Sequence, residues 1–167
     1  MRKGFSIIET LVYISLLAAI FLLFVNFTTG LVRSYGIVKA IRDLDNGALV
    51  SMERITREIR GSTTVDMGQT ILDTSPGKLV LNQIDSLGAT TQTVFLVVNG
   101  NLNITISGVD KGSLLPDGVT VTNLKFTKID STHSNAIKID ITLRSTRGKI
   151  TKDENYHSTI IMRGSYK

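Results

Sequence analysis

Lys3-Gly4-Phe5-Ser6-Ile7-Ile8-Glu9-Thr10-Leu11 opens an apolar run that continues to Phe27. The run from Phe5 to Phe27 has 23 positions, and its non-apolar residues are Ser6, Glu9, Thr10, Ser15 and Asn26. An α-helix rises about 1.5 Å per residue, so this run would be about 34 Å long. A hydrocarbon core is about 30 Å thick. The sequence therefore predicts a transmembrane helix over residues 5–27.

The residues that flank the run predict its orientation and its retention. Arg2 and Lys3 precede it, so the positive-inside rule places the N-terminus in the cytoplasm and the rest of the chain outside. A secretory signal has a shorter apolar core that a small-residue cleavage site follows. Here Leu17-Ala18-Ala19 lies inside the run, with no break after it. We expect the apolar segment to be retained as an anchor.

Glu9 is the only charged residue in the apolar run. A carboxylate inside a membrane helix costs several kcal/mol unless it finds a partner, so its usual interpretation is functional. The alternative is that Glu9 lies at the level of the headgroups and is solvated there. The physics of this one residue leaves both interpretations open.

The whole N-terminal pattern resembles that of type IV pilins and type II secretion pseudopilins. The features that carry the resemblance are the basic residues Arg2 and Lys3, then Gly4, Phe5 and Glu9 at a fixed offset, and the long apolar run. The resemblance implies that a prepilin peptidase cleaves between Gly4 and Phe5 on the cytoplasmic face and methylates the new N-terminal Phe5. It also implies that Glu9 pairs with the N-terminal amine of a neighbouring subunit during assembly.

The same resemblance implies a location and a set of partners. The chain would first be a single-pass protein of the inner membrane with its head outside, and then part of a pilus or pseudopilus filament. Its partners would be the prepilin peptidase, other pilin or pseudopilin subunits, the inner-membrane assembly platform and membrane lipid. The protein would be a structural subunit and not an enzyme.

A change of pattern follows the apolar run. Asn26, Thr28, Thr29 and Gly30 are poor helix formers, and they predict a bend or a loosened turn where the helix leaves the membrane. Apolar residues then recur at steps of three and four, which is typical of one face of an amphipathic helix. This stripe consists of Tyr35, Val38, Ile41, Leu44, Ala48, Met52, Ile55 and Ile59. Gly61 marks the predicted helix end.

From Ser62 onward the period changes to the alternation of β-strands. The predicted strands cover residues 78–84, 93–98, 102–106, 119–126, 137–143 and 156–163. Asn99-Gly100 predicts a hairpin and Pro116-Asp117-Gly118 a turn. The apolar positions slip by one near Thr122-Asn123, which predicts a β-bulge. Residues 144–155 are polar and charged, and they are predicted to form a loop.

This order predicts an α+β fold, in which a long helix packs on an antiparallel β-sheet. The resemblance implies the pilin form of this fold. The expected divisions are a leader at residues 1–4, a transmembrane and assembly helix at 5–27, its amphipathic continuation at 28–61 and a β-rich head at 62–167. Two further parts of the chain resemble PilW-type minor pilins and J-type pseudopilins: the helix end from Met52 to Arg60, and the segment from Val119 to Phe126 together with the Ile-rich strand and the final strand near Met162-Arg163 that follow it. Because the stripe has a partner sheet in the same chain, residues from Ser34 onward should fold without the membrane segment.

Other chemistry has little support in the sequence. The 167 residues include no cysteine and no nucleophile-elbow, zinc-protease or phosphate-loop motif. His133 and His157 are far apart, and the acidic residues at loops lack calcium-loop spacing, so neither a metal nor a cofactor is expected. The formal net charge of +5 is scattered, which signals DNA only weakly. The alternative function is a filament-borne adhesin or DNA-uptake module; a membrane-tethered enzyme has no motif in its favour.

Overall fold

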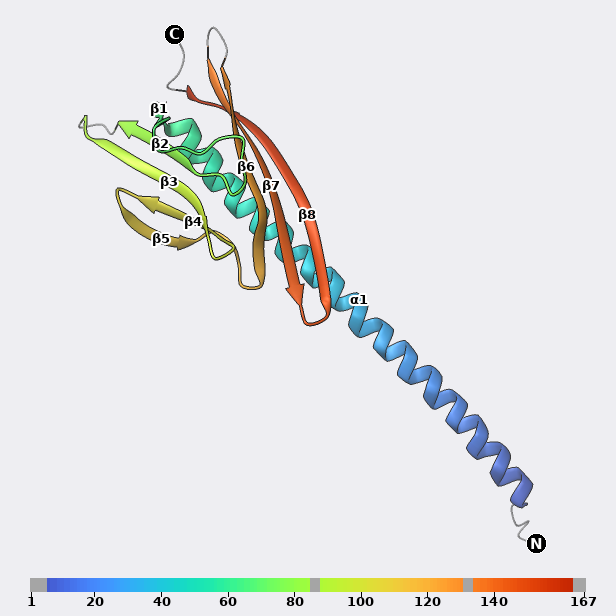
Figure 1. Cartoon of the computed structure of the whole chain (residues 1–167). Helices are drawn as coiled ribbons and strands as arrows, with labels where there is room; N and C mark the ends of the chain where they lie inside the picture. The colour runs from blue at the N-terminus through green and yellow to red at the C-terminus, as the bar shows by residue number, and fades with distance from the viewer. Residues whose placement is uncertain (1–5, 85–87, 131–133, 164–167) are drawn as a thin grey trace. The chain divides into compact units, whose positions relative to one another are not determined.

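The computed structural model describes residues 6–84, 88–130 and 134–163. The chain divides into two compact units, residues 1–39 and 40–167. One helix, α1 (Ile7–Gly61), contributes to both units and has 55 residues, as the sequence predicts (Figure 1). The fold is α+β, with one long apolar N-terminal helix followed by antiparallel β-sheets.

In the first unit α1 has no core of its own. Among the described residues it is the one helix that is long and apolar enough to cross a membrane, and none of its apolar window is buried. α1 is continuous through residues 26–30, where the sequence predicted a bend or a loosened turn. The hydroxyls of Thr28 and Thr29 donate to the carbonyls of Phe24 and Val25 one turn earlier, at 2.9 and 2.6 Å. These bonds satisfy both side chains without breaking the helix.

The second unit contains two antiparallel sheets, where the sequence predicted one (Figure 1). The first has the order β1-β2-β3-β4-β5 and the second the order β6-β7-β8. Their strands are β1 (Thr64–Val65), β2 (Leu79–Ile84), β3 (Thr90–Val98), β4 (Asn101–Ile106), β5 (Val109–Ser113), β6 (Val119–Asp130), β7 (Asn135–Arg147) and β8 (Ile150–Ile161). The sequence missed β1 and β5, which are short edge strands without buried residues.

The irregular segment between β1 and β2, residues 66–78, joins the two sheets. The amides of Asp73 and Gly77 donate to the carbonyls of Phe126 and Leu124 in β6, each at 2.8 Å. A Cβ on Gly77 would lie 3.1 Å from the Leu124 carbonyl oxygen, so glycine allows this close approach. The segment therefore takes the place of a strand beside β6.

Two local predictions are confirmed, one from turn chemistry and one from a slip in the apolar pattern. Asn99 and Gly100 join β3 to β4 with φ of 51° and 78°, the positive values that a tight two-residue hairpin requires. The register of β6 against β7 shifts between Val121 and Asn123, where the sequence predicted a bulge.

The predicted loop over residues 144–155 is wrong. β7 continues to Arg147 and β8 starts at Ile150, so the two strands are paired along almost the whole stretch. Arg144 donates to both carboxylate oxygens of Asp153 at 2.7 Å, and this hydrogen bonding lowers the pKa of Asp153. Most side chains here are exposed on both faces, so the alternation that reveals a half-buried strand is missing.

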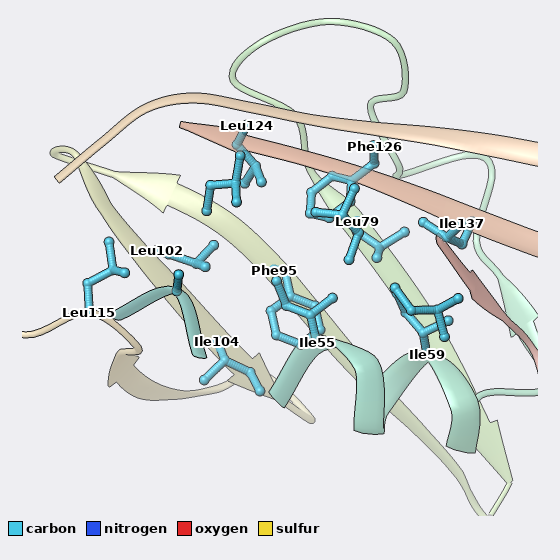
Figure 2. Close-up of a cluster of buried hydrophobic side chains, with 14 of the residues drawn as sticks. Ile55, Ile59, Leu79, Phe95, Leu102, Ile104, Leu115, Leu124, Phe126 and Ile137 are labelled. Carbon is cyan, nitrogen blue, oxygen red and sulfur yellow. The ribbon is translucent and has the colours of Figure 1, made fainter. Parts of the chain in front are cut away.

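One hydrophobic core unites both sheets with the second half of α1 (Figure 2). Ile55 and Ile59 of α1 lie against side chains from the first sheet, such as Phe95, and from the second sheet, such as Phe126 and Ile137. Alternate residues of β7 are buried, as predicted for residues 137–143. Ile160 and Met162, which lie in the predicted strand over residues 156–163, are also buried.

The predicted stripe is confirmed only from Leu44 to Ile59. Tyr35, Val38 and Ile41 are exposed, with Tyr35 at 71%, and the buried face begins at Ala40. Helical spacing shows which residues share a face, but not how far along the helix a partner sheet extends. The three exposed residues are therefore a correction to the predicted core.

Candidate functional site

The predicted processing site lies outside the described residues. Arg2, Lys3, Gly4 and Phe5 precede Ser6, where the described part of the chain begins. The assignment of cleavage and methylation to Gly4 and Phe5 thus stays a prediction from the sequence.

Glu9 lies in the first turn of α1, and its side chain is exposed. A carboxylate is favourable at this position, since the first amides of a helix carry partial positive charge. The phenol of Tyr13 donates to Glu9 Oε1 at 3.4 Å. Glu9 and Tyr13 are four residues apart, so they lie on the same face of the helix. The described structure thus gives Glu9 a neutral hydrogen-bond donor from its own helix.

The aliphatic hydroxyls near Glu9 donate to backbone carbonyls and not to the carboxylate. Thr10 donates to the Ser6 carbonyl at 3.2 Å, and Ser15 donates to the Val12 carbonyl at 2.8 Å. Such bonds to the preceding turn satisfy a hydroxyl where water is absent. The phenol of Tyr13 is the donor that reaches the carboxylate.

A groove of ≈ 490 Å³ lies between α1 and β8 in the second unit. Its lining includes Asp45 and Met52 from α1 and Tyr156 from β8. The Tyr156 hydroxyl donates to Asp45 Oδ1 at 2.9 Å. Burial raises the pKa of Tyr156, and the hydrogen bond to Asp45 and its negative charge raise it further. Beside this groove, Arg147 Nε donates to Asp43 Oδ2 at 2.6 Å. These two bonds tie the β7–β8 hairpin to α1.

We expect Tyr156 to make the protein less stable in alkali. Its pKa is higher in the folded state than the ordinary 10.0, so its contribution to stability is complete below about pH 10. That contribution is lost as the pH rises toward the pKa of the folded state. Urea unfolding of the head from pH 8 to pH 11 should therefore show the wild type losing stability relative to Tyr156→Phe only as the pH rises above about 10. A constant difference between the two proteins over this range would contradict the prediction.

A second cleft, of ≈ 460 Å³, is lined by arginines near the end of α1. Arg57 and Arg60 of α1 meet Arg163 there, and Glu53 lies beside them. Glu53 accepts from Arg57 at 2.7 Å. Guanidinium groups bind phosphate and carboxylate well, so this cleft is the described feature that bears on an anionic partner.

The described part of the chain contains no candidate metal site. Within it no group of three or more His, Asp or Glu residues gathers as metal ligands do. His133 lies outside the described residues, and His157 is exposed on β8 opposite Asp140.

Sequence reasoning missed three of these contacts. The spacing of Glu9 and Tyr13, four residues apart, is a signal that could have revealed their pairing. The partners of Asp43 and Asp45 are 104 and 111 residues away, and nothing in the pattern connects them.

Comparisons with family models, with curated proteins and with solved structures found no match. The fold and the N-terminal sequence of this chain therefore carry the functional argument.

Proposed function

We propose that this protein is a minor pilin or pseudopilin, a structural subunit that is built into a type IV pilus or a type II secretion-like filament. One observation carries the proposal. The run from Lys3 through Gly4 and Phe5 to Glu9 leads directly into a helix whose apolar window has no buried residue, and the second half of that helix belongs to a compact helix-and-sheet unit.

The exposure of α1 supports the proposal. Large apolar side chains such as Ile8, Leu17 and Phe24 are exposed along the first unit, and a soluble monomer rarely leaves so much apolar surface uncovered. A bilayer would cover them before assembly, and the helices of other subunits would cover them within a filament. The second unit has its own core, so it can fold outside the membrane.

The proposed role of each N-terminal residue follows from its chemistry. Arg2 and Lys3 hold the leader in the cytoplasm, where prepilin peptidase cleaves after Gly4. Phe5 then carries a new amine, which the peptidase methylates. Glu9 of one subunit pairs with this amine on the next, so a costly membrane carboxylate gains its opposite charge only on assembly. The assembly platform and membrane lipid are the other proposed partners.

Within this class we favour a PilW-type minor pilin or a J-type pseudopilin. The end of the helix and the final strands carry that resemblance, and the chain has no cysteine for the C-terminal disulfide loop of many major pilins.

Substitution of Gly4 tests the proposal. The native chain is expected to begin at a methylated Phe5, and Gly4→Leu is expected to leave a slower-migrating chain that retains residues 1–4. The reason is that the small glycine at the cleavage point is the feature that the peptidase requires in this family. Mass spectrometry of the purified membrane protein measures the methylated N-terminus of the native chain and the retained residues 1–4 of Gly4→Leu. A native chain that begins at Met1, or one cut beyond residue 20, would overturn the proposal.

The arginine cleft is the observation that favours the alternative of a DNA-binding or adhesive module. Three arginines and one glutamate line it, but none of the described residues in the lining is aromatic and able to stack on bases. The structural-subunit proposal is therefore preferred. The head can be titrated with duplex DNA at two salt concentrations, and no binding at low salt would remove the DNA version.

A further inference from the structure

Tyr13 stands out among the polar residues of the apolar helix because its hydroxyl reaches Glu9. The distance from Tyr13 Oη to Glu9 Oε1 is 3.4 Å, whereas Thr10, Ser15, Thr28 and Thr29 donate to backbone carbonyls of the preceding turn. A phenol within an apolar stretch usually has a polar partner, and here the side-chain partner is the carboxylate.

The position of Tyr13 determines which way the carboxylate turns. Glu9 is four residues after Phe5 and four residues before Tyr13. Side chains four residues apart are neighbours on a helix, which brings the Tyr13 phenol within reach of Glu9. After cleavage the amine of Phe5 would compete for Glu9 within the same chain. The hydrogen bond to Tyr13 turns the carboxylate toward the other end of the helix.

We infer that Tyr13 is a positioning residue that holds Glu9 away from its own amino terminus and presents it to the amine of a neighbouring subunit. This inference rests on the proposed function. A carboxylate offers about four acceptor sites, so Glu9 can keep the Tyr13 bond while it accepts the neighbour's amine. Without the phenol, Glu9 pairs with its own amine, and that pair must break before assembly.

Four chains test the inference: the wild type, Tyr13→Phe, Glu9→Gln and the double variant. Tyr13→Phe keeps the ring and removes only the hydroxyl. It should leave processing and membrane level unchanged and lower recovery in sheared filaments by about threefold to tenfold, the range expected for the net contribution of one ordinary hydrogen bond. In the Glu9→Gln background the same change should have no further effect. Tyr35→Phe, on an exposed part of α1, is the matched control and should behave as the wild type.

A direct measurement separates positioning from packing. In membranes that hold dispersed, processed chains, the infrared band of the Glu9 carboxyl group is the one that disappears in Glu9→Gln. We expect Tyr13→Phe to shift this band. Filament recovery equal to the wild type, or an unshifted band, would overturn the inference. A wild-type chain that is never processed or incorporated would instead overturn the proposed function, so the two failures are distinguishable.

Discussion

The head with Ile55→Asp is expected to be unfolded at temperatures where the wild-type head is stable. Ile55 is completely buried in the core that α1 shares with both sheets (Figure 2). An unpaired charge in such a place costs several kcal/mol, and the whole stability of a small domain is about 5–15 kcal/mol. The fragment to be melted begins at Ser34, six residues before the buried face starts at Ala40, and Ser34 can cap the shortened helix. Circular dichroism measures the transition.

Val50→Asp is the matched control for this substitution. Val50 is also β-branched and lies on the same helix, but 53% of it is exposed. An aspartate there should cost under about 1 kcal/mol, as surface changes usually do. If the two variants melted at the same temperature, α1 would not pack on the sheets through its Ile55 face.

The structure corrects one expectation about this face of α1. From the sequence Arg54 lies beside the stripe, which predicts that Arg54→Glu costs well under 1 kcal/mol. The structure raises the expected cost above this value, since Arg54 forms an ion pair with Glu58 at 2.8 Å, and Glu58 is only 8% exposed. Gln83 also donates to the Glu58 carboxylate, at 3.0 Å. A second glutamate at position 54 would place two carboxylates together and remove a partner from a buried one.

The parts of the fold that were predictable from the sequence are those in which a short local pattern has a single physical explanation. Asn99-Gly100 specified a hairpin because both residues tolerate positive φ. Alternation over residues 137–143 specified a strand because one of its faces is buried. Where both faces are exposed, as around Arg144 and Asp153, strand pairing depends on backbone hydrogen bonds and on a cross-strand ion pair. Neither of these produces an alternation of apolar and polar residues in the sequence.

The division into two sheets was not predictable for a related reason. It depends on the irregular segment near Gly77 meeting β6, which is a contact between residues far apart in the chain. The candidate site shows the same contrast between local patterns, which the sequence reveals, and contacts that are distant in the chain, which it does not. The pattern of Gly4, Phe5 and Glu9 is local, so the sequence alone suggested it. The bond from Arg147 to Asp43 is distant in sequence, and only the structure shows it.

Glu9→Gln is expected to reach the membrane at the normal level and to be poorly recovered in filaments. The change removes a charge from the apolar run, so insertion becomes easier. The Tyr13 phenol can still donate to the amide oxygen of glutamine, so the helix keeps a polar contact there. The loss is the charge that would meet a neighbour's amine, and that attraction is strongest where water is scarce. Removing one member of such a pair should lower recovery by about tenfold or more.

Glu53→Gln is the control that isolates the position of the charge. Glu53 lies on the same helix and pairs with Arg57 at 2.7 Å, but both side chains are largely exposed. Exposed pairs of this kind contribute little, about 0.3–0.5 kcal/mol when they are four residues apart on a helix. Glu53→Gln should therefore insert, fold and assemble as the wild type does. Comparing membrane fractions with sheared filaments for both variants measures the effect. Unchanged incorporation of Glu9→Gln would show that Glu9 is a solvated residue at the headgroups, and the ion pair would have to be abandoned.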